Sequence, residues 1–254
     1  KSASISTFKK QLYKIVKGNQ YNYVLRITSS ALGFMDLKIA HKAGADVCAA
    51  RSSNSSDGGS LKSKIAHKLG SILYGQYVNV KIAPSNLAAE YTFGKKAYKN
   101  GDVSILHNAI DIDEYCFDAE MRNHIRSKFK IQDETTVFGH VGRFMTQKNH
   151  SFLLEVFSEY IKLNKSGVLM LVGGGELEST IKEKAFKLGI LDKIIFTGIR
   201  SDVQALMSAM DVFVFPSLYE GMPNTVIEAQ ATGLPCVISN TITREANITG
   251  LVHY

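Results

Sequence analysis

The sequence holds few cysteines and no long apolar segment. Three cysteines occur among 254 residues. Cys48, Cys116 and Cys236 stand apart, and no Cys-x-x-Cys or Cys/His spacing links them. This scarcity argues against a metal site and favours a reducing compartment. Because no run of about 18 apolar residues occurs, the sequence predicts no membrane-spanning helix.

Several nucleotide-binding and nucleic-acid-binding signatures are also missing. The P-loop pattern G-x-x-x-x-G-K-[S/T] does not occur. Segment 171–178, LVGGGELE, runs from apolar residues into glycines, but Glu178 stands three positions after Gly175, where the dinucleotide fingerprint needs glycine. We therefore interpret the segment as a tight strand-to-helix turn. Without an RNA-binding or DNA-binding motif, we expect no nucleic-acid partner.

Positive charge is concentrated in the N-terminal part of the chain. Residues 1–110 hold 16 Lys and Arg against 5 Asp and Glu, a balance of +11, whereas residues 136–254 hold 10 against 11, a balance of −1. This asymmetry predicts different partners for the two parts. The excess of positive charge in residues 1–110 suits binding to a membrane surface or to a polyanionic acceptor. A role in solubility alone explains this excess equally well.

Short apolar runs alternate with helical periodicity along the whole chain. The expected strands are 23–29, 45–50, 78–83, 103–107, 136–143, 167–175, 193–198, 211–217 and 234–240. The expected helices are 5–16, 31–44, 59–74, 85–94, 150–163, 176–188, 201–209 and one that begins near Pro223. Near-continuous apolar strands between helices predict parallel sheets covered on both faces.

The predicted fold class is α/β, with two Rossmann-like parallel-sheet domains that face a cleft. The first domain covers residues 1–115 and the second covers residues 136–254. Residues 116–135 carry charge and helical character without strand runs, so we expect them to form the linker.

The segment GHVGRFMTQKNH, residues 139–150, is a candidate ligand-binding loop. It places Arg143 and Lys148 between a strand that ends near Gly142 and the following helix. Ligands of open parallel sheets bind outside the carboxyl ends of the strands. Two cations and glycine-freed backbone amides at that place suit a diphosphate.

The segment YEGMPNTVIEAQATG, residues 219–233, follows another strand. Glu220 lies in the loop, Gly221 permits close approach of a ligand to the backbone, and Pro223 suits the first turn of a helix. The amides near Asn224 and Thr225 would then form a helix N-terminus that attracts an anion.

The spacing of two carboxylates in this segment indicates separate roles. Glu228 stands eight positions after Glu220. At about 100° per residue, eight residues end about 80° past two turns, so the two side chains would not share a helix face. With Glu220 in the loop and Glu228 inside the helix, we expect them to reach different parts of an extended ligand.

These residues carry a family resemblance. EGMPNTVIE resembles the Glu-x7-Glu motif of retaining glycosyltransferases of family 4, which have the two-domain GT-B fold. GRFMTQKNH resembles the family's Gly-Arg-…-Lys loop, LVGGGE its strand-turn, and FTGIRSDV its base-proximal loop. LHNAIDIDEY resembles its linker motif, with Ala109 in place of glycine. The resemblance covers residues 45–254, most strongly after 136, and is closest to bacterial enzymes of capsular and exopolysaccharide synthesis.

The resemblance implies roles for individual residues. The catalytic residues would be Glu220, which bonds hydroxyls of the transferred sugar, with Arg143 and Lys148 on the donor's diphosphate. The backbone at Ile199 and Arg200 would flank the base, and Glu228 would bind the ribose hydroxyls. The full donor-binding set would be Gly142, Ile199, Arg200, Gly221, Met222, Pro223, Asn224, Thr225 and Glu228.

The chain departs from the family in two ways. Arg51 and Ser53 stand where a His-x-His-Asn motif is usual, so we expect Arg51 or Asn54 only to position substrate. His140 is expected to be a core residue, not a substitute for the missing histidines. The chain starts without Met or the apolar core of a signal peptide. We expect both domains to be truncated parts of a longer protein.

The expected activity is transfer of a sugar, with retention, from a nucleotide sugar, UDP-linked, to a saccharide or lipid-linked acceptor of cell-surface polysaccharide. No metal or other cofactor is expected, because Arg, Lys and a helix dipole can stabilise the leaving diphosphate. The expected location is cytoplasmic, with peripheral contact at the inner membrane face through the basic helix at 60–75.

Other functions fit the same residues. A nucleotide-sugar epimerase and a glycogen-synthase-like polymerase use the same scaffold, and a non-catalytic nucleotide-sugar-binding subunit would explain the missing histidines. A nicotinamide-dependent dehydrogenase fits least, since its fingerprint is absent.

Overall fold

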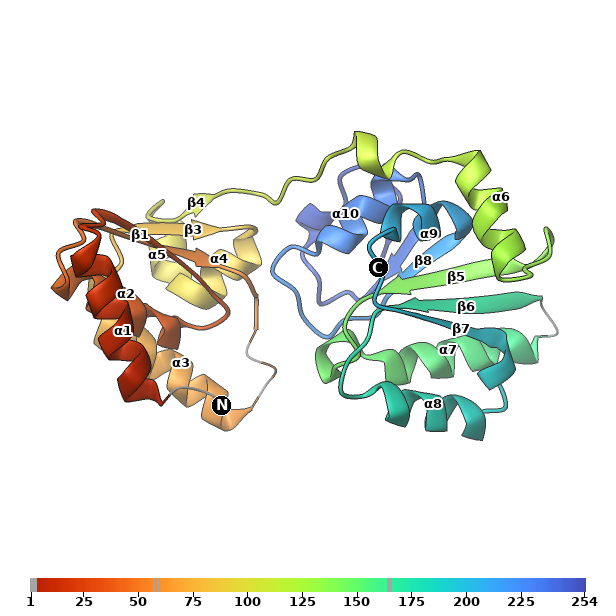
Figure 1. Cartoon of the computed structure of the whole chain (residues 1–254), viewed down its shortest axis with the longest axis horizontal. Helices are drawn as coiled ribbons and strands as arrows, with labels where there is room; N and C mark the ends of the chain where they lie inside the picture. Colours follow the sequence, from red (N-terminus) through yellow and green to blue (C-terminus); the bar gives the residue numbers. More distant parts are fainter. Residues whose placement is uncertain (1–3, 57, 59, 164–165) are drawn as a thin grey trace. The chain divides into compact units, whose positions relative to one another are not determined.

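The computed structural model describes residues 4–254 except 57, 59 and 164–165. The chain divides into two compact units. The first unit comprises Lys1–Asn108 and Tyr219–Met222, and the second comprises Ala109–Leu218 and Pro223–Tyr254. Each unit contains a parallel sheet with helices packed on it (Figure 1). The predicted class of two α/β parallel-sheet units is confirmed.

The first unit has a four-stranded sheet in the order β1-β2-β3-β4, with every pair parallel. Its strands are β1 (Tyr23–Thr28), β2 (Val47–Ser52), β3 (Val80–Ala83) and β4 (Ser104–Ile105). Its helices are α1 (Ile5–Gly18), η1 (Ala31–Gly33), α2 (Phe34–Lys42), α3 (Leu61–Tyr74), η2 (Gly75–Tyr77), α4 (Asn86–Phe93) and α5 (Lys95–Lys99). The helix predicted at 31–44 is therefore split into a 3-10 turn and α2.

Helices α1 and α4 of the first unit begin at serines, which helix starts favour. The Ser4 hydroxyl accepts a hydrogen bond from the Thr7 amide at 3.2 Å, and Ser85 accepts from the Ala88 amide at 3.3 Å. Each such cap contributes about 1 kcal/mol to helix stability. The helix at 5–16 was predicted from its apolar spacing, and the helix at 85–94 from a serine at its start.

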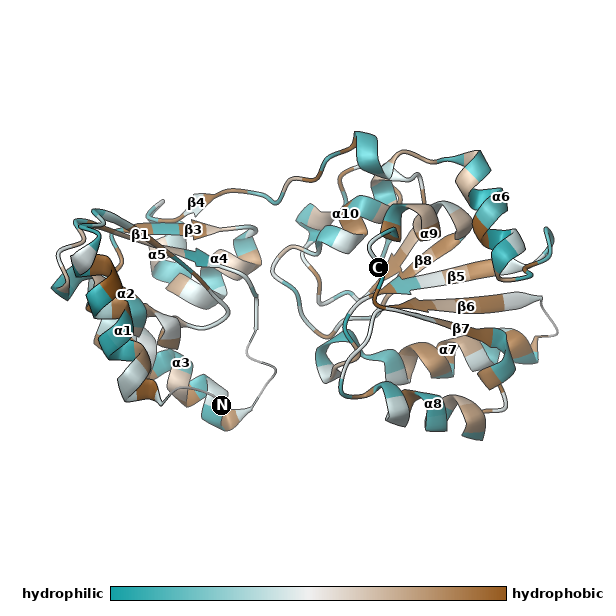
Figure 2. Ribbon diagram, in the orientation of Figure 1, coloured by the Kyte–Doolittle hydropathy of each residue, from teal (hydrophilic) through white to brown (hydrophobic). Residues whose placement is uncertain are grey.

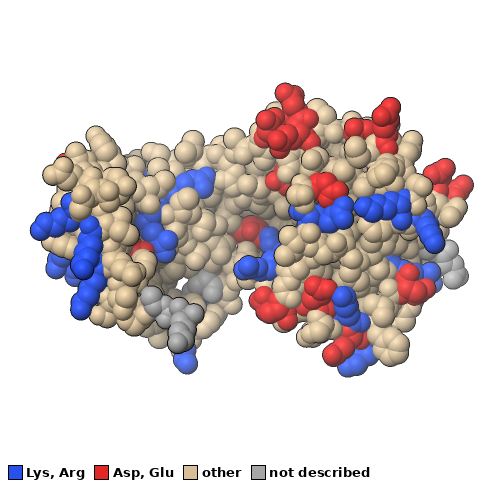
Figure 3. All heavy atoms as spheres, in the orientation of Figure 1, with Lys and Arg blue, Asp and Glu red and all other residues tan. Residues whose placement is uncertain are grey.

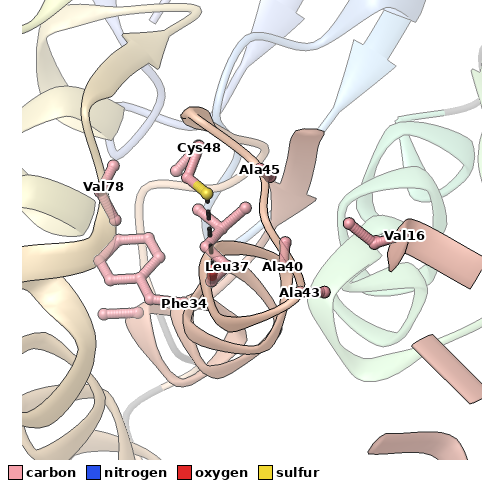
Figure 4. Packing of buried hydrophobic residues seen from close by; sticks show 10 residues of the cluster. Val16, Phe34, Leu37, Ala40, Ala43, Ala45, Cys48 and Val78 are labelled. Carbon is pink, nitrogen blue, oxygen red and sulfur yellow. Dashed lines mark hydrogen bonds between the residues drawn. The ribbon is translucent and has the colours of Figure 1, made fainter. Parts of the chain in front are cut away.

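The core of the first unit lies between α2 and the sheet. Phe34 and Leu37 of α2 pack with Cys48 of β2 and with Val78 (Figure 4). The Cys48 thiol donates to the Leu37 carbonyl at 3.5 Å. Burial raises the pKa of this thiol, which keeps Cys48 an unreactive core residue.

One face of β1 is open. Tyr23, Leu25 and Ile27, which share this face, are 78%, 55% and 52% exposed. Within the described residues, no helix covers them. The prediction that helices cover both faces of the sheets is therefore wrong for this strand.

The second unit has a six-stranded parallel sheet in the order β10-β9-β8-β5-β6-β7. The strands are β5 (Thr136–Val141), β6 (Gly167–Val172), β7 (Ile194–Gly198), β8 (Val212–Phe215), β9 (Cys236–Ile238) and β10 (Val252–His253). The helices are η3 (Asp113–Tyr115), α6 (Ala119–Lys128), η4 (Thr146–Lys148), α7 (His150–Lys162), α8 (Glu178–Lys187), η5 (Leu191–Lys193), α9 (Val203–Ala209), α10 (Asn224–Ala231) and η6 (Arg244–Ala246).

Helices cover both faces of this second sheet. Figure 1 shows α7 and α8 on one face and α6, α9 and α10 on the other. The strands between them are mostly apolar (Figure 2), and Leu169, Met170 and Leu171 of β6 are fully buried. Burial on two faces explains why these strands read as continuous apolar runs in the sequence.

Helix α6 belongs to the second unit because two arginines fix it there. Arg122 donates to Asp211 Oδ1 at 2.6 Å, and Arg126 donates to Asp211 Oδ2 at 3.3 Å. The same Oδ2 accepts from the amide of Val137 in β5 at 2.7 Å. Arg126 is 4% exposed, so this carboxylate neutralises a buried charge. Most of the segment 116–135 is thus packed against the second sheet.

Charged side chains are distributed differently in the two units. Figure 3 shows Lys and Arg gathered where α1 and α2 lie, whereas both signs are mixed over the second unit. Among the helices of the described residues, none has the length and apolar content needed to cross a membrane.

Candidate functional site

The strand order of the second sheet reverses at its centre. Strands β6 and β7 follow β5 on one side, and β8, β9 and β10 extend on the other. The pairs Phe138↔Val212 and Gly139↔Phe213 place β5 and β8 in parallel register. The loops that follow β5 and β8 therefore leave the sheet at one edge, on either side of the reversal, where open α/β sheets bind ligands.

The loop after β5 carries the two predicted cations. Arg143 is exposed and Lys148, at the end of η4, is half-buried. The Lys148 ammonium lies 4.6 Å from the centroid of the Phe215 ring. The space around Gly142 is tight. An added Cβ would lie 3.0 Å from His140 Nε2 and 3.2 Å from Lys148 Cδ, so a larger residue here would press on the Lys148 side chain. Two cations at a strand end, one exposed and one held over an aromatic ring, suit a polyphosphate.

The glycines after β6 allow the backbone of this turn to pack closely against the loop after β5. A Cβ on Gly173, whose φ is +138°, would lie 2.2 Å from the Gly142 carbonyl oxygen, and one on Gly175 would lie 2.6 Å from the Phe144 oxygen. The Phe144 amide donates to the Gly174 carbonyl at 3.0 Å. The segment LVGGGE is thus a close-packed turn, in agreement with the interpretation that it is not a dinucleotide fingerprint.

Helix α10 begins directly after Pro223. Its first turn contains Asn224, which is exposed, and Thr225, which is half-buried. No side chain caps this end within the part of the chain that the structure describes. An uncapped helix N-terminus beside a strand edge has partly positive amides that favour an anion. The sequence predicted Pro223 in the first turn of the helix, but it stands one residue before the helix. At this position its missing N–H removes no helical hydrogen bond.

Glu228 lies on α10 and has a neighbour, Tyr115 of η3, that the sequence did not indicate. The Tyr115 phenol acts as a hydrogen-bond donor that lowers the pKa of Glu228. Burial raises the pKa of Glu228, and this hydrogen bond opposes the rise. Burial and the nearby Glu228 charge raise the pKa of Tyr115, which stays a protonated donor. No local periodicity connects the two residues, so only the fold could reveal the pair.

Ile199 and Arg200 follow β7. Ile199 is 85% exposed, and a Cβ on Gly174 would lie 3.2 Å from its Cγ1. An exposed aliphatic side chain beside a glycine turn suits the face of a flat ring. The Arg200 guanidinium is occupied by Asp202, with Nε–Oδ1 at 2.8 Å and Nη2–Oδ2 at 2.6 Å.

Glu220, Gly221 and Met222 belong to the first unit. Glu220 is half-buried, while Gly221 and Met222 are buried. Within this unit, Ser85 Oγ donates to the Gly221 carbonyl at 2.6 Å, and Asn108 Nδ2 donates to the Met222 carbonyl at 2.9 Å. The other predicted site residues all belong to the second unit, and among them a Cβ on Gly142 would lie beside Lys148.

Two histidines lie beneath the loop after β5. His140 and His150 are 0% and 2% exposed, and their ring centroids are 4.6 Å apart. His140 Nδ1 lies 2.9 Å from the Val214 carbonyl, and His150 stacks on Phe144. Burial lowers the pKa of His140 well below its usual value and that of His150 to about 4. His140 is therefore a neutral core residue, as the sequence predicted.

In the first unit, Arg51 is engaged with the chain itself. Its Nη2 donates to Asn108 Oδ1 at 2.6 Å and to the Leu106 carbonyl at 3.4 Å. Asn54 Oδ1 accepts from the Ser55 amide at 3.0 Å. In the stretch 50–59, positions 57 and 59 lie outside the described residues. Across the described ranges, no three His, Cys, Asp or Glu side chains gather as a metal site would need.

Comparison with known proteins gives a family match. The family model described as "Glycosyl transferases group 1" matches residues 121–248, which are 128 of the 254 residues. The match begins in α6 and ends after η6, so it covers both loops at the reversal of the second sheet.

Two curated relatives are each similar to part of this chain. EpsF from Bacillus subtilis (strain 168) is 35% identical over 160 residues, 63% of this chain and 42% of that protein. The "UDP-Gal:alpha-D-GlcNAc-diphosphoundecaprenol alpha-1,3-galactosyltransferase" of Escherichia coli is 34% identical over 142 residues, 54% of this chain and 36% of that protein. The chain thus spans about two fifths of the length of these relatives.

A solved structure has the same fold. The Anabaena protein Alr3699/HepE, in complex with UDP and glucose, superposes with a TM-score of 0.74 at 17% identity. The superposition covers 94% of this chain and 65% of that chain. The likeness extends over both units, and it places the chain among proteins of the GT-B fold.

Proposed function

We propose that this chain, which belongs to the group 1 glycosyl transferases, transfers a sugar from a nucleotide sugar with retention at the anomeric carbon. The donor is UDP-linked, and the acceptor is a saccharide or lipid-linked precursor of a cell-surface polysaccharide. The observation that carries this proposal is the convergence of Arg143, Lys148 and the α10 N-terminus at the reversal of the second sheet. The name of the Escherichia coli relative, with its UDP-linked donor and diphosphoundecaprenol acceptor, supports both substrate classes.

Arg143 and Lys148 stabilise the departing diphosphate. Loss of a nucleoside diphosphate leaves an oxocarbenium-like sugar, and negative charge builds on the leaving phosphate. Two cations and the positive end of α10 oppose that charge without a metal ion. Ile199 packs against the base, Glu228 binds the ribose hydroxyls, and Glu220 bonds hydroxyls of the transferred sugar.

Donor binding is the first test of this function. Calorimetry with UDP, GDP, ADP and their common sugars should show the strongest binding for a uridine nucleotide. Lys148→Ala should weaken binding of the diphosphate by about tenfold or more, because charged hydrogen bonds contribute about 1.5–3 kcal/mol. The matched control is Lys187→Ala, on an exposed position of α8, which should bind as the unaltered protein does. Failure of all nucleotides to bind would overturn the proposal.

A non-catalytic nucleotide-sugar-binding subunit is the second candidate, favoured by the engagement of Arg51 with Asn108. A nucleotide-sugar epimerase on the same scaffold is distinguished by its product. Product analysis of the protein with donor and a polysaccharide precursor separates the three. Transfer requires an acceptor, epimerisation changes the donor without one, and a binding subunit leaves the donor unchanged.

The basic helix α3 supports peripheral binding to the cytoplasmic face of a membrane. Its apolar stripe contains Leu61, Ile65, Leu69 and Ile72, all exposed. Lys62, Lys64 and Lys68 of the same helix are also exposed. An apolar stripe with adjacent lysines suits anionic lipid. Sedimentation with liposomes should show binding that rises with anionic lipid and falls with salt; binding indifferent to both would contradict this location.

A further inference from the structure

We infer that Arg51 is a positioning residue for the loop that carries Glu220, and that it acts through the side chain of Asn108. The inference rests on the proposed function, in which Glu220 bonds hydroxyls of the transferred sugar. Arg51 itself touches no reacting atom. Its contribution concerns the sugar end of the donor and leaves binding of the nucleotide end unchanged.

The loop Tyr219–Met222 is held by side chains of the first unit, to which it belongs. Three consecutive backbone carbonyls of this loop each accept a hydrogen bond from one of these side chains. The donors and their acceptors are Ser55 Oγ to the Glu220 carbonyl, Ser85 Oγ to the Gly221 carbonyl at 2.6 Å and Asn108 Nδ2 to the Met222 carbonyl at 2.9 Å. Buried carbonyls need such partners, so these donors set the course of the loop.

The loop also lies close to the backbone that follows β2. A Cβ on Gly221 would lie 2.7 Å from the Ser53 carbonyl oxygen and 3.0 Å from the Asn54 nitrogen. Without a side chain, the two backbones can approach this closely. Together with the three hydrogen bonds, this contact restricts the loop, so a change at one donor is transmitted to Glu220.

Arg51 fixes which end of the Asn108 amide faces the loop. Its Nη2 donates to Asn108 Oδ1 at 2.6 Å and to the Leu106 carbonyl at 3.4 Å. Because a guanidinium carries only donors, the amide must present its oxygen to Arg51. The Nδ2 donor then faces the Met222 carbonyl. Loss of Arg51 removes the donor that holds this orientation, and the hydrogen bond to Met222 weakens.

The two ends of the proposed donor site belong to different units of the chain. Glu220 belongs to the first unit, whereas Lys148 and Glu228 belong to the second. A change at Arg51 should therefore alter recognition of the sugar and spare recognition of UDP. An arginine with only a structural role would affect both alike.

The test measures binding of UDP, UDP-glucose, UDP-galactose and UDP-N-acetylglucosamine by calorimetry. Four forms of the protein are compared: unaltered, Arg51→Met, Asn108→Leu and the double variant. Arg51→Met keeps an aliphatic stem and removes the donors. We expect it to weaken binding of the tightest UDP-sugar by about threefold to tenfold, as for loss of one neutral hydrogen bond. UDP should bind within about twofold of the unaltered protein, since its proposed partners lie in the second unit.

Two further comparisons connect the effect to the Asn108 contact. Arg51→Met should add less than about twofold once Asn108 is already Leu, because the two residues act in one chain of hydrogen bonds. Arg51→Lys keeps a charged donor at this place and should recover most of the affinity for the UDP-sugar.

The matched control is Arg26→Met, which removes an arginine from the neighbouring strand β1, where its Nε lies 2.9 Å from Asp36 Oδ2. It should leave the ratio of UDP-sugar to UDP affinity unchanged. Hydrogen exchange of the protein without nucleotide gives a second readout. The peptide that spans 219–222 should exchange faster in Arg51→Met and not in Arg26→Met.

An equal loss of UDP and UDP-sugar affinity in Arg51→Met, or an equal effect with and without Asn108, would overturn the inference and assign Arg51 a structural role. Unchanged exchange of the 219–222 peptide would also overturn it. If the unaltered protein binds UDP and Arg51→Met binds every UDP-sugar as well as before, this inference alone fails. If the unaltered protein binds no nucleotide, the proposed function fails, and the role of Arg51 toward the sugar fails with it.

Discussion

The ammonium group of Lys148 lies over the ring of Phe215, with Nζ 4.6 Å from the ring centroid. Lys148 comes from the loop after β5, and Phe215 is the last residue of β8. The contact therefore bridges the two strands between which the sheet order reverses. It holds a cation at the place where the proposed diphosphate binds.

Comparing Phe215→Leu with Phe213→Leu should separate the effect of the Lys148–Phe215 contact on UDP binding from the effect of core packing on stability. The variant loses a cation–π interaction of about 1 kcal/mol, and UDP affinity should fall about threefold to fivefold. The matched control is Phe213→Leu, since Phe213 is equally buried in β8 and stacks with Phe215. Both variants should lose about 1–2 kcal/mol of unfolding free energy. Equal UDP affinity in the two would show that the Lys148 contact does not matter for binding.

Gly173→Ala should damage both stability and donor binding. The new Cβ would lie 2.2 Å from the Gly142 carbonyl oxygen at a φ of +138°, so the loop after β5 must move. We expect a loss of about 3 kcal/mol or more in urea unfolding. Gly189→Ala, with φ +68° and open space around it, should lose only about 1 kcal/mol. Similar losses in both would mean that the close approach is not required.

The buried histidine pair should make stability fall in acid. Burial lowers the pKa of His150 to about 4 and lowers that of His140 also, whereas an unfolded imidazole titrates near about 6.5. Between these values the unfolded chain binds protons that the folded chain does not. The free energy of unfolding should therefore fall as the pH drops through this window, by about 3 kcal/mol for His150 alone.

Urea unfolding from about pH 7 to about pH 4.5 measures this dependence. His150→Phe, which preserves stacking on Phe144, should flatten the curve. His253→Gln, at an exposed position, should leave it unchanged. A curve of the same steepness in His150→Phe would be evidence against this origin.

The two glutamates of the motif should have separable effects. Glu228→Ala should weaken UDP binding by about tenfold, since it removes a charged acceptor. Glu220→Ala should retain UDP affinity and lower the rate of sugar transfer by about 100-fold. Calorimetry and initial rates measure the two quantities. An equal loss of UDP affinity in both variants would contradict the assignment of Glu228 to the ribose and Glu220 to the sugar.

Much of the second unit was predictable because its strands are buried on two faces. The runs at β5, β6 and β8 are apolar throughout, and their order with the helices gave the parallel sheet. Strand β10 was missed, since Val252–His253 is too short for any periodicity. The open face of β1 was also missed, because an apolar alternation looks the same whether or not a layer covers it.

The candidate site was predictable only where its residues are close in sequence. Arg143 and Lys148 share one loop, and Asn224 to Glu228 share one helix. Tyr115 is 113 positions from Glu228 (228 − 115 = 113), and no local pattern joins them. The sequence also could not show why the segment LVGGGE needs glycines. The atoms that leave no room for a Cβ there belong to Gly142 and Phe144, in the loop after β5.

The pairing of Arg126 with Asp211 also has a consequence for the order of assembly. The two residues are 85 positions apart, so a ribosome releases α6 long before its counter-charge exists. Helix α6, although early in the unit, can reach its final position only after β8 has joined β5. Contacts of such long sequence separation slow folding. We expect α6, although it is the first α-helix of this unit, to dock only once β8 is in place during synthesis.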